Sequence, residues 1–521
     1  PTSYHQVVQK NQVELQSLIE NGVVKPFLVH HLLIYACLPL LALLIPRRKG
    51  SKYVRPLAFV LTVSIAIDTI KSRRMLLGAN GYMLGLAMSW WVFWCGTLLV
   101  FNDAEKDFKR LERTATTSRG GSKPKHALLN GNGQPVNGSH EIFKGSATPS
   151  RQERFGCSTM SRPRLSAADH SFKQSSHQRE TFAWQAYPQP FLHRLNWSLG
   201  LLFNMRGPEW NWRISSLGPL PTSVSKQLNS CRPHAHYEPK SAEHRDAIAR
   251  LKASFLSFFK SYLCLDIAKC LMMRDPYFWG MVSPSSPPPS PFSLFSGYPV
   301  LICLYRLHLS AFGIVSALAY ACSLNPIVFL GLSLAFPKVS WSLTSVPVDA
   351  PWLYSGAFGP FVEPIMNHGL AGCWGQWWHQ LFRFGFTSTA HWVLSLLPVK
   401  LGSSLPFRRI VVVFLVFAIS GVLHACGSYT QYANTKPLSG PFLYFILQAA
   451  GITVQNVFSK AVLPRICHRE LPQWLRRAAN FIFAYTWLMG SGSLIANDFA
   501  RGGVWLTEPI PISPLRGLRI A

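Results

Sequence analysis

Charged residues are scarce in this chain of 521 residues. Asp, Glu, Lys and Arg together make up only 14%, whereas hydrophobic residues make up 48% and aromatic residues 13%. Soluble domains usually carry about a quarter charged residues. The shortage excludes a set of ordinary soluble domains, and the long apolar runs predict an all-α fold, a polytopic bundle of transmembrane helices.

Acidic residues are scarcer still. The 22 Asp and Glu residues stand against 51 Lys and Arg, which gives a net charge of +29. An excess of this size can indicate a nucleic-acid-binding protein. Here the basic residues flank apolar segments or fall in one long loop, and no nucleic-acid motif accompanies them. We therefore expect cytosolic loops beside anionic lipid and no nucleic-acid partner.

Paired cysteines and a secretory leader are also missing. The 11 cysteines include no C-x-x-C pair, and several lie inside apolar runs. This argues against a disulfide framework or a zinc site, so we expect reduced thiols and no metal. Residues 1–25 lack a basic segment followed by a short apolar core, so we expect no cleavable signal peptide. The first membrane segment should then direct a multi-pass protein to the endoplasmic reticulum.

The apolar runs predict about eight membrane spans. The N-terminal region, residues 1–101, holds runs at 26–45, 56–70 and 82–101, the last with aromatic residues suited to an interface belt. The run at 56–70 is basic at both flanks, so the positive-inside rule does not orient it, and a re-entrant or tilted segment is an alternative. Residues 298–336 hold two spans separated at Asn325-Pro326. Further spans are expected near 410–425, 441–458 and 481–496.

Three other regions follow from shifts in composition. Residues 102–181 are rich in Ser, Gly, Asn, Lys and Arg and predict a disordered basic cytosolic loop. Residues 182–249 contain a tryptophan cluster but no apolar run long enough to span a membrane. This pattern predicts an amphipathic interfacial region. The tryptophan cluster would serve as a membrane anchor or as a gate beside the substrate entrance. Residues 250–521 form the membrane core, where Asp266 and Lys269 are spaced to pair on one helix face.

The stretch GLAGCWGQWWHQLFRFGF, residues 369–386, predicts one helix with a chemical edge. On a period of 3.6 residues, Gln376, His379, Gln380 and Arg383 fall on one stripe. The opposite face is aromatic and includes Trp374, Trp377 and Trp378. A polar stripe of this kind faces a cavity or the aqueous boundary. The alternative is an interfacial anchor helix with no chemistry.

His424 lies near the end of the apolar run that begins at Ile410. Burying an ionisable group at such depth is costly, so intramembrane histidines usually face a partner or a water-filled cavity. The alternative is a neutral histidine that donates to a backbone carbonyl of a neighbouring helix. With two histidines in adjacent hydrophobic elements, we favour a reactive site.

The sequence WGQWWH at residues 374–379 resembles the W-G-x-x-W-[NH] signature of the wax-synthase-like branch of the membrane-bound O-acyltransferases. His424 stands where that family keeps its embedded histidine. Within the branch, the chain is most similar to fungal enzymes that acetylate terpenoid and meroterpenoid natural products. Plant-type members usually have an aromatic residue before the first tryptophan and Asn at the last position; here those are Cys373 and His379.

The resemblance implies transfer of an acetyl group from acetyl-CoA, a co-substrate, to a hydroxyl of a terpenoid, with no bound cofactor. A partly desolvated histidine can take the hydroxyl proton, so His424 is the expected base for direct attack. His379 or Gln376 would hold the thioester carbonyl or orient His424, and Arg383 would meet a phosphate of coenzyme A. Trp374 and Trp378 complete the expected substrate site. The alternatives are a long-chain wax or sterol ester synthase and a non-catalytic transporter.

Overall fold

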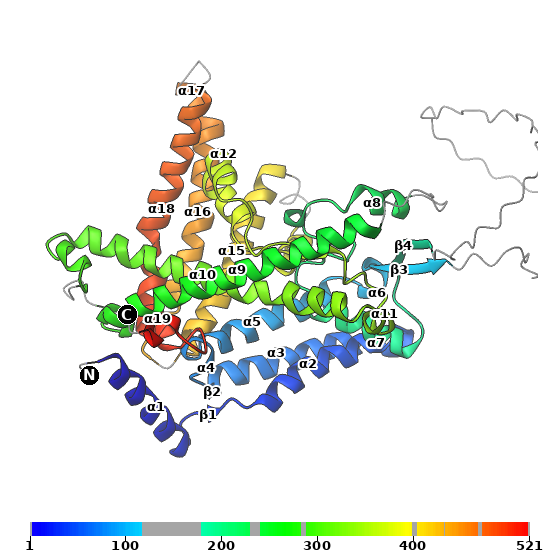
Figure 1. The fold of residues 1–521 in the computed structure, drawn as a ribbon, viewed down its shortest axis with the longest axis horizontal. Helices are drawn as coiled ribbons and strands as arrows, with labels where there is room; N and C mark the ends of the chain where they lie inside the picture. The colour runs from blue at the N-terminus through cyan, green and yellow to red at the C-terminus, as the bar shows by residue number, and fades with distance from the viewer. Residues whose placement is uncertain are drawn as a thin grey trace, which may run out of the picture. The chain divides into compact units, whose positions relative to one another are not determined.

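The computed structural model describes residues 3–116, 179–229, 240–282, 288–398, 404–431, 433–466 and 471–518. The chain divides into two compact units. The first consists of Pro1–Arg113 together with Phe182–Ala521, and the second is Thr114–Thr181. The first unit contains the helices (Figure 1). Thr114 belongs to β3 (Arg110–Thr116) and Thr181 to β4 (Arg179–Gln185). In the second unit, their hydroxyls lie 2.7 Å apart and share a hydrogen bond.

Five helical segments in the described part of the chain are long and apolar enough to cross a membrane: Lys49–Ser72, Tyr82–Phe101, Pro299–Ala335, Leu405–Tyr429 and Leu438–Ile466. A shorter apolar helix covers His30–Leu44. Strands among the described residues are confined to two two-stranded sheets. The all-α architecture of an integral membrane protein is therefore confirmed, whereas the count of about eight spans is not.

The N-terminal helices pack side by side. Helices α2 (Val29–Leu44) and α3 (Val54–Ser72) form a hairpin, and α5 (Tyr82–Gly96) packs against α3 (Figure 1). Strand β1 (Lys25–Pro26) pairs with β2 (Arg73–Arg74), so the start of α2 meets the end of α3. Because α3 is one continuous helix, the structure gives no support to the re-entrant alternative for residues 56–70.

The loop between α2 and α3 contacts the end of the following span. Arg47 lies 3.2 Å from the Asp103 carboxylate, and Arg55 pairs with Glu105. The basic loop and residues 103–105 therefore lie at one end of the helices, and the cytosolic location of this end stays a prediction. The prediction of a disordered loop from 102 onwards is wrong for 102–116, because buried Phe108 and Leu111 anchor that segment. The remainder, 117–178, lies outside the described residues.

The interfacial region is more buried than expected. It contains α7 (Phe191–Leu202) and α8 (Thr222–Asn229). Trp197 and Trp210 are 0% and 1% exposed and belong to one hydrophobic cluster with Trp94 of α5. The anchor prediction is thus wrong for Trp210 of the predicted tryptophan cluster, since its ring is buried in the protein and packs against Trp197. Helix α7 also exposes the apolar residues Phe191, Leu192 and Leu199, and its place at the membrane interface stays a prediction.

Helices α9 (Lys240–Arg274) and α10 (Pro299–Ala335) run along each other (Figure 1). The predicted break at Asn325-Pro326 is wrong, because α10 continues through a buried Pro326. Proline removes one backbone hydrogen bond of a helix. A helix that packs on other helices tolerates this loss. Asp275, after α9, forms a buried ion pair of 2.9 Å with Arg306 of α10, which the sequence interpretation did not foresee.

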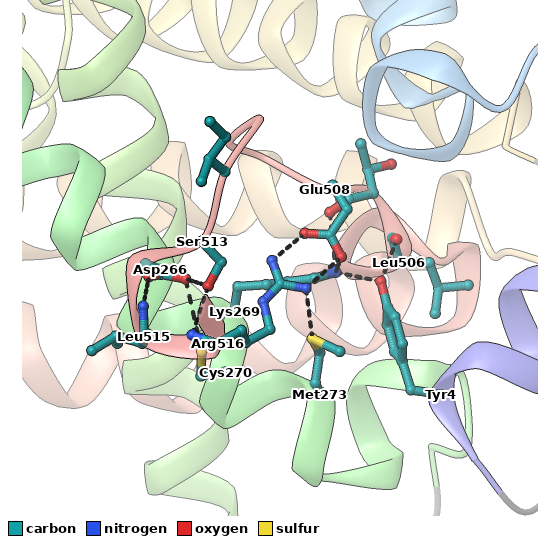
Figure 2. Close-up of polar contacts among 12 residues, drawn as sticks. Tyr4, Asp266, Lys269, Cys270, Met273, Leu506, Glu508, Ser513, Leu515 and Arg516 are labelled. Atoms are coloured by element: carbon teal, nitrogen blue, oxygen red, sulfur yellow. Dashed lines mark hydrogen bonds and ion pairs between the residues drawn. The ribbon is translucent and has the colours of Figure 1, made fainter. Parts of the chain in front are cut away.

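Asp266 and Lys269 do not pair with each other in the described structure; each contacts a different segment (Figure 2). Asp266 accepts hydrogen bonds from the Ser513 hydroxyl and, at 2.9 Å, from the Leu515 N–H. The Lys269 ammonium donates to the Tyr4 hydroxyl at 2.5 Å and to two backbone carbonyls, of Trp505 at 2.6 Å and Thr507 at 3.1 Å. The ion-pair prediction is wrong because partners far away in the sequence bind both groups instead.

The second half of the chain forms the bundle that carries the signature. Helix α15 (Leu405–Tyr429) packs against α5, against α13 (Arg383–Ser395) and against α16 (Leu443–Val457). Helix α12 (Val362–Gly372) packs on α18 (Gln473–Gly502) (Figure 1). Other elements are α1 (Tyr4–Glu20), η1 (Lys49–Ser51), α4 (Leu77–Asn80), η2 (Thr97–Phe101), α6 (Ala104–Asp107), η3 (Ser215–Leu217), η4 (Pro276–Trp279), η5 (Phe292–Phe295), α11 (Pro337–Leu343), η6 (Pro351–Leu353), η7 (Cys373–Trp377), η8 (Leu438–Phe442), η9 (Phe458–Val462), α17 (Leu463–Ile466), η10 (Val504–Leu506) and α19 (Pro514–Gly517).

Candidate active site

His424 lies where three helices meet. It is near the C-terminal end of α15 and is partly buried. Its Nδ1 shares a hydrogen bond with the Tyr82 hydroxyl of α5. Its ring stacks on Phe445 of α16, with 4.5 Å between centroids and 21° between planes. The polar partner is thus a side chain of a neighbouring helix, and not the backbone carbonyl of the alternative interpretation.

The signature stretch is not one helix. Helix α12 ends at Gly372, residues Cys373–Trp377 form a turn of π-helix, and α13 starts only at Arg383. At Trp378 the backbone becomes extended, with φ −60° and ψ 149°. The prediction of a continuous helix over 369–386 is therefore wrong, and the polar stripe that it implied does not exist as a stripe.

Side chains of the signature stabilise this break. The Gln380 amide donates to the carbonyls of Trp374 at 2.8 Å and Trp378 at 2.7 Å, which a continuing helix would have occupied. Arg383 Nη1 donates to the Gly375 carbonyl at 2.9 Å and to the Gln380 side chain at 3.0 Å. One end of the Arg383 guanidinium is therefore engaged with the turn, and its contact with a phosphate of coenzyme A stays a prediction.

His379 sits in the extended segment, outside the five candidate spans. Its ring contacts Trp378 at 5.2 Å and Phe382 at 5.8 Å between centroids. Burial, and to a smaller extent the nearby Arg206 guanidinium, lower the pKa of His379 to about 4. Its Nδ1 is buried without a hydrogen-bond partner in the described residues. His379 is thus a neutral imidazole with an available polar atom.

The two histidines are brought together. A continuous series of aromatic contacts connects them: His424 on Phe445 (4.5 Å), Phe445 on Trp374 (5.9 Å), Trp374 on Trp378 (5.6 Å) and Trp378 on His379 (5.2 Å). Trp378 therefore contacts His379 directly, and Trp374 joins Trp378 to the Phe445 ring that stacks on His424. The Gln376 side chain is exposed, and its role in substrate binding stays a prediction.

Three polar residues near this site were missed by the sequence interpretation. Tyr82, taken for part of an interface belt, is buried. Gln448 of α16 is fully buried and accepts from the Trp374 indole N–H at 3.4 Å. Arg206 donates to the Gly356 carbonyl at 2.8 Å beside His379. A buried Gln in an apolar helix is a detectable signal, whereas the positions of Tyr82 and Arg206 depend on distant contacts.

Residues 354–447 match the model of the Membrane bound O-acyl transferase family. These residues include the π-turn, His379 and His424. Over this segment the chain is therefore similar to that family. Among similar proteins, O-Mevalon transferase yanI of Aspergillus niger is 25% identical over 276 residues, 51% of this chain and 53% of that protein.

Two further similar proteins are also fungal. O-Mevalon transferase macI of Penicillium terrestre is 25% identical over 57% of this chain and 61% of its own length. Acetyltransferase fsoF of Humicola fuscoatra is 39% identical over 25% of this chain and 30% of its own length. The chain thus matches between about half and three fifths of the first two relatives. No solved structure gives a significant match.

Proposed function

We propose that this protein is an integral membrane O-acyltransferase that moves an acetyl group from acetyl-CoA to a hydroxyl of a hydrophobic acceptor, such as a terpenoid. The observation that carries the proposal is the meeting of His424 and His379 within one aromatic cluster inside the family-matched segment. The proposed location is the membrane of the endoplasmic reticulum, with the basic loops in the cytosol.

Direct attack assigns a role to each histidine. His424 takes the proton of the acceptor hydroxyl while the oxygen attacks the thioester carbonyl. The neutral His379 imidazole, whose Nδ1 has no partner in the described residues, donates to the carbonyl oxygen as negative charge develops there. The intermediate then releases coenzyme A as a thiol and leaves the ester. The surrounding tryptophans exclude water, which would otherwise hydrolyse the thioester.

A covalent acyl-enzyme has less support. Cys373 is the cysteine nearest to the signature histidine in sequence, and its side chain is buried. Burial raises the pKa of the Cys373 thiol to about 12, so the thiolate needed for nucleophilic attack is not populated at cytosolic pH. Direct transfer needs no such thiolate.

The names of the relatives support acetyl-CoA as the acyl donor and leave a mevalonyl thioester as the alternative donor. Acetyltransferase fsoF and Acetyltransferase aurG of Calcarisporium arbuscula favour an acetyl donor. The relatives with the longest matches are named O-Mevalon transferases, so a mevalonyl thioester is the second donor to test. A long-chain acyl-CoA, as in a wax or sterol ester synthase, is the third.

The test compares membranes that contain the wild type or His424→Ala. Each is given isotope-labelled acetyl-CoA with a panel of terpenoid and fatty alcohols, and esters are identified by mass spectrometry. We expect labelled terpenoid ester from the wild type and a loss of at least about 100-fold in the variant, since general-base catalysis contributes about that much. Ester from a fatty alcohol and a long-chain donor only would favour the ester synthase. No ester from any of the three donors, with correctly inserted protein, would contradict the proposal and favour a transporter.

A further inference from the structure

Tyr82 is the polar side chain that meets His424 from outside the family-matched segment. It is the first residue of α5, is buried, and its hydroxyl shares a hydrogen bond with His424 Nδ1. Its ring also makes an edge contact with Phe499 of α18, with 4.9 Å between centroids. The phenol is therefore enclosed between α5, α15 and α18.

The junction of α5 and α15 is built so that this phenol has one position. The Thr430 hydroxyl accepts from the Gly85 N–H at 2.9 Å and donates to the Gly81 carbonyl at 3.0 Å. A Cβ at Gly427 would come within 2.8 Å of the Tyr82 ring, so only glycine lets the ring lie against α15. These contacts fix the start of α5 on the helix that carries His424.

We infer that Tyr82 is a positioning residue that holds His424 in the tautomer whose Nε2 is free to act as base. The inference rests on the proposed function. A neutral imidazole carries one proton, and a phenol oxygen can accept the N–H of the ring. The bond can run in either direction, and only the one in which Nδ1–H donates to the Tyr82 oxygen leaves the lone pair on Nε2. Nδ1 is then occupied by Tyr82, which leaves Nε2 as the nitrogen for the substrate.

The hydrogen bond to Tyr82 persists through the reaction. When Nε2 takes the proton of the acceptor hydroxyl, the ring becomes an imidazolium and both nitrogens carry hydrogen. Tyr82 then accepts from a charged donor, and such bonds are about twice as strong as neutral ones. When the thioester C–S bond breaks, the proton leaves Nε2 for the departing sulfur, which gives the free thiol of coenzyme A. Tyr82 thus stabilises the charged state of His424 without touching the substrate.

The consequence is that the reactive centre is shared between two regions. Residues 354–447 supply both histidines, whereas the partner of His424 comes from the N-terminal region, far upstream in sequence. The sequence predicts N-terminal transmembrane segments for residues 1–101. In the structure, one of these segments, α5, supplies the hydrogen-bond partner of His424.

The experiment is Tyr82→Phe, which removes the hydroxyl and keeps the ring. We expect kcat to fall roughly 10- to 100-fold, the value of a lost hydrogen bond to a charged group, with KM for the donor and the acceptor unchanged. The matched control is Tyr35→Phe. Tyr35 is also buried, and its hydroxyl bonds to the Thr69 side chain at 2.6 Å between α2 and α3. This control should leave kcat unchanged while it lowers thermal stability as much as Tyr82→Phe does.

The double variant separates this inference from the proposed function. In the His424→Ala background, Tyr82→Phe should cause no further loss, because residues that act as one unit are not additive. A wild-type kcat for Tyr82→Phe, a change confined to KM, or a further loss in the double variant would overturn the role of Tyr82 while His424 remains the base. Full activity of His424→Ala would instead overturn the proposed function, and the inference with it.

Discussion

At the scale of single residues, His379 is held neutral by its surroundings. Its ring is packed among Trp378 and Phe382, and the Arg206 guanidinium is close by. Desolvation and a like charge both disfavour the imidazolium. The residue is therefore suited to donate a hydrogen bond at cytosolic pH, and unsuited to carry a proton between substrates.

This environment predicts a dependence of stability on pH. The pKa of His379 is lowered from 6.5 to about 4 in the folded protein. Between these values the unfolded chain binds a proton that the folded protein does not, so the contribution of His379 to stability is complete above pH 6.5 and is lost as the pH falls toward 4. The shift corresponds to roughly 3 kcal/mol at most.

The measurement is thermal unfolding of detergent-purified wild type and His379→Asn at pH 7.5 and 5.0, which lie on either side of the titration of free histidine, about 6.5. Asn has no imidazole to titrate, so the variant should lose less stability on acidification than the wild type. Equal losses in the two proteins would show that His379 is not the residue that titrates.

At the scale of elements, the bend inside α12 depends on one glycine. Gly369 has φ 58° and ψ −132°, a region that residues with a Cβ rarely adopt. A Cβ at this position would lie 1.9 Å from Gln455 Nε2. Gln455 in turn accepts from the Leu370 N–H at 3.0 Å and donates to Asn480 at 3.0 Å. The bend therefore sets how the π-turn and His379 are presented to α16 and α18.

We expect Gly369→Ala to destabilise the protein by at least about 1–3 kcal/mol, the usual cost of a strained backbone, and to reduce activity because the π-turn shifts. Thermal unfolding and the ester assay measure the two effects. The control is Gly490→Ala on α18, where a Cβ would meet no atom within 4 Å. That substitution should leave stability unchanged or raise it slightly, since alanine favours a helix. Unaltered stability in Gly369→Ala would contradict the role of the bend.

At the scale of the whole molecule, one helix holds segments from both ends of the described chain. On α9, Asp266 binds Ser513 and Leu515, while Lys269 binds Tyr4 of α1 and the backbone near Trp505 (Figure 2). Both charged groups are buried, so their hydrogen bonds are needed to offset the cost of desolvation. These contacts attach residues 504–516 to α9.

Asp266→Ala should loosen this attachment, because the Ser513 hydroxyl and the Leu515 N–H lose their acceptor. The loss of hydrogen bonds to a charged group costs about 1.5–3 kcal/mol, enough to expose the segment locally. We expect faster trypsin cleavage after Arg516 in the purified variant than in the wild type. Glu363→Ala is the control, since it breaks the exposed pair with Arg477, at 3.5 Å, and should leave cleavage unchanged. Equal cleavage in the wild type and Asp266→Ala would contradict the attachment.

Local pattern was enough to predict the class of the protein, and the roles of His379 and His424 stay predictions. Apolar runs, few charges and flanking basic residues predict membrane helices, because each property depends on residues close together in sequence. The WGQWWH motif and His424 led to the family by the same kind of local evidence. Local pattern failed at the helix break after Trp377, because a periodicity of 3.6 residues cannot show that Gln380 will bond the carbonyls of Trp374 and Trp378.

What the sequence by itself determined is therefore the helical membrane architecture and the resemblance of the signature segment to the O-acyl transferase family. Only the tertiary structure decided which polar groups meet: Tyr82 with His424, Asp275 with Arg306, and Asp266 with Ser513. In an apolar interior, a buried polar group must find a partner at any sequence distance. Nothing in the spacing of neighbouring residues specifies that partner, because it depends on how the helices pack.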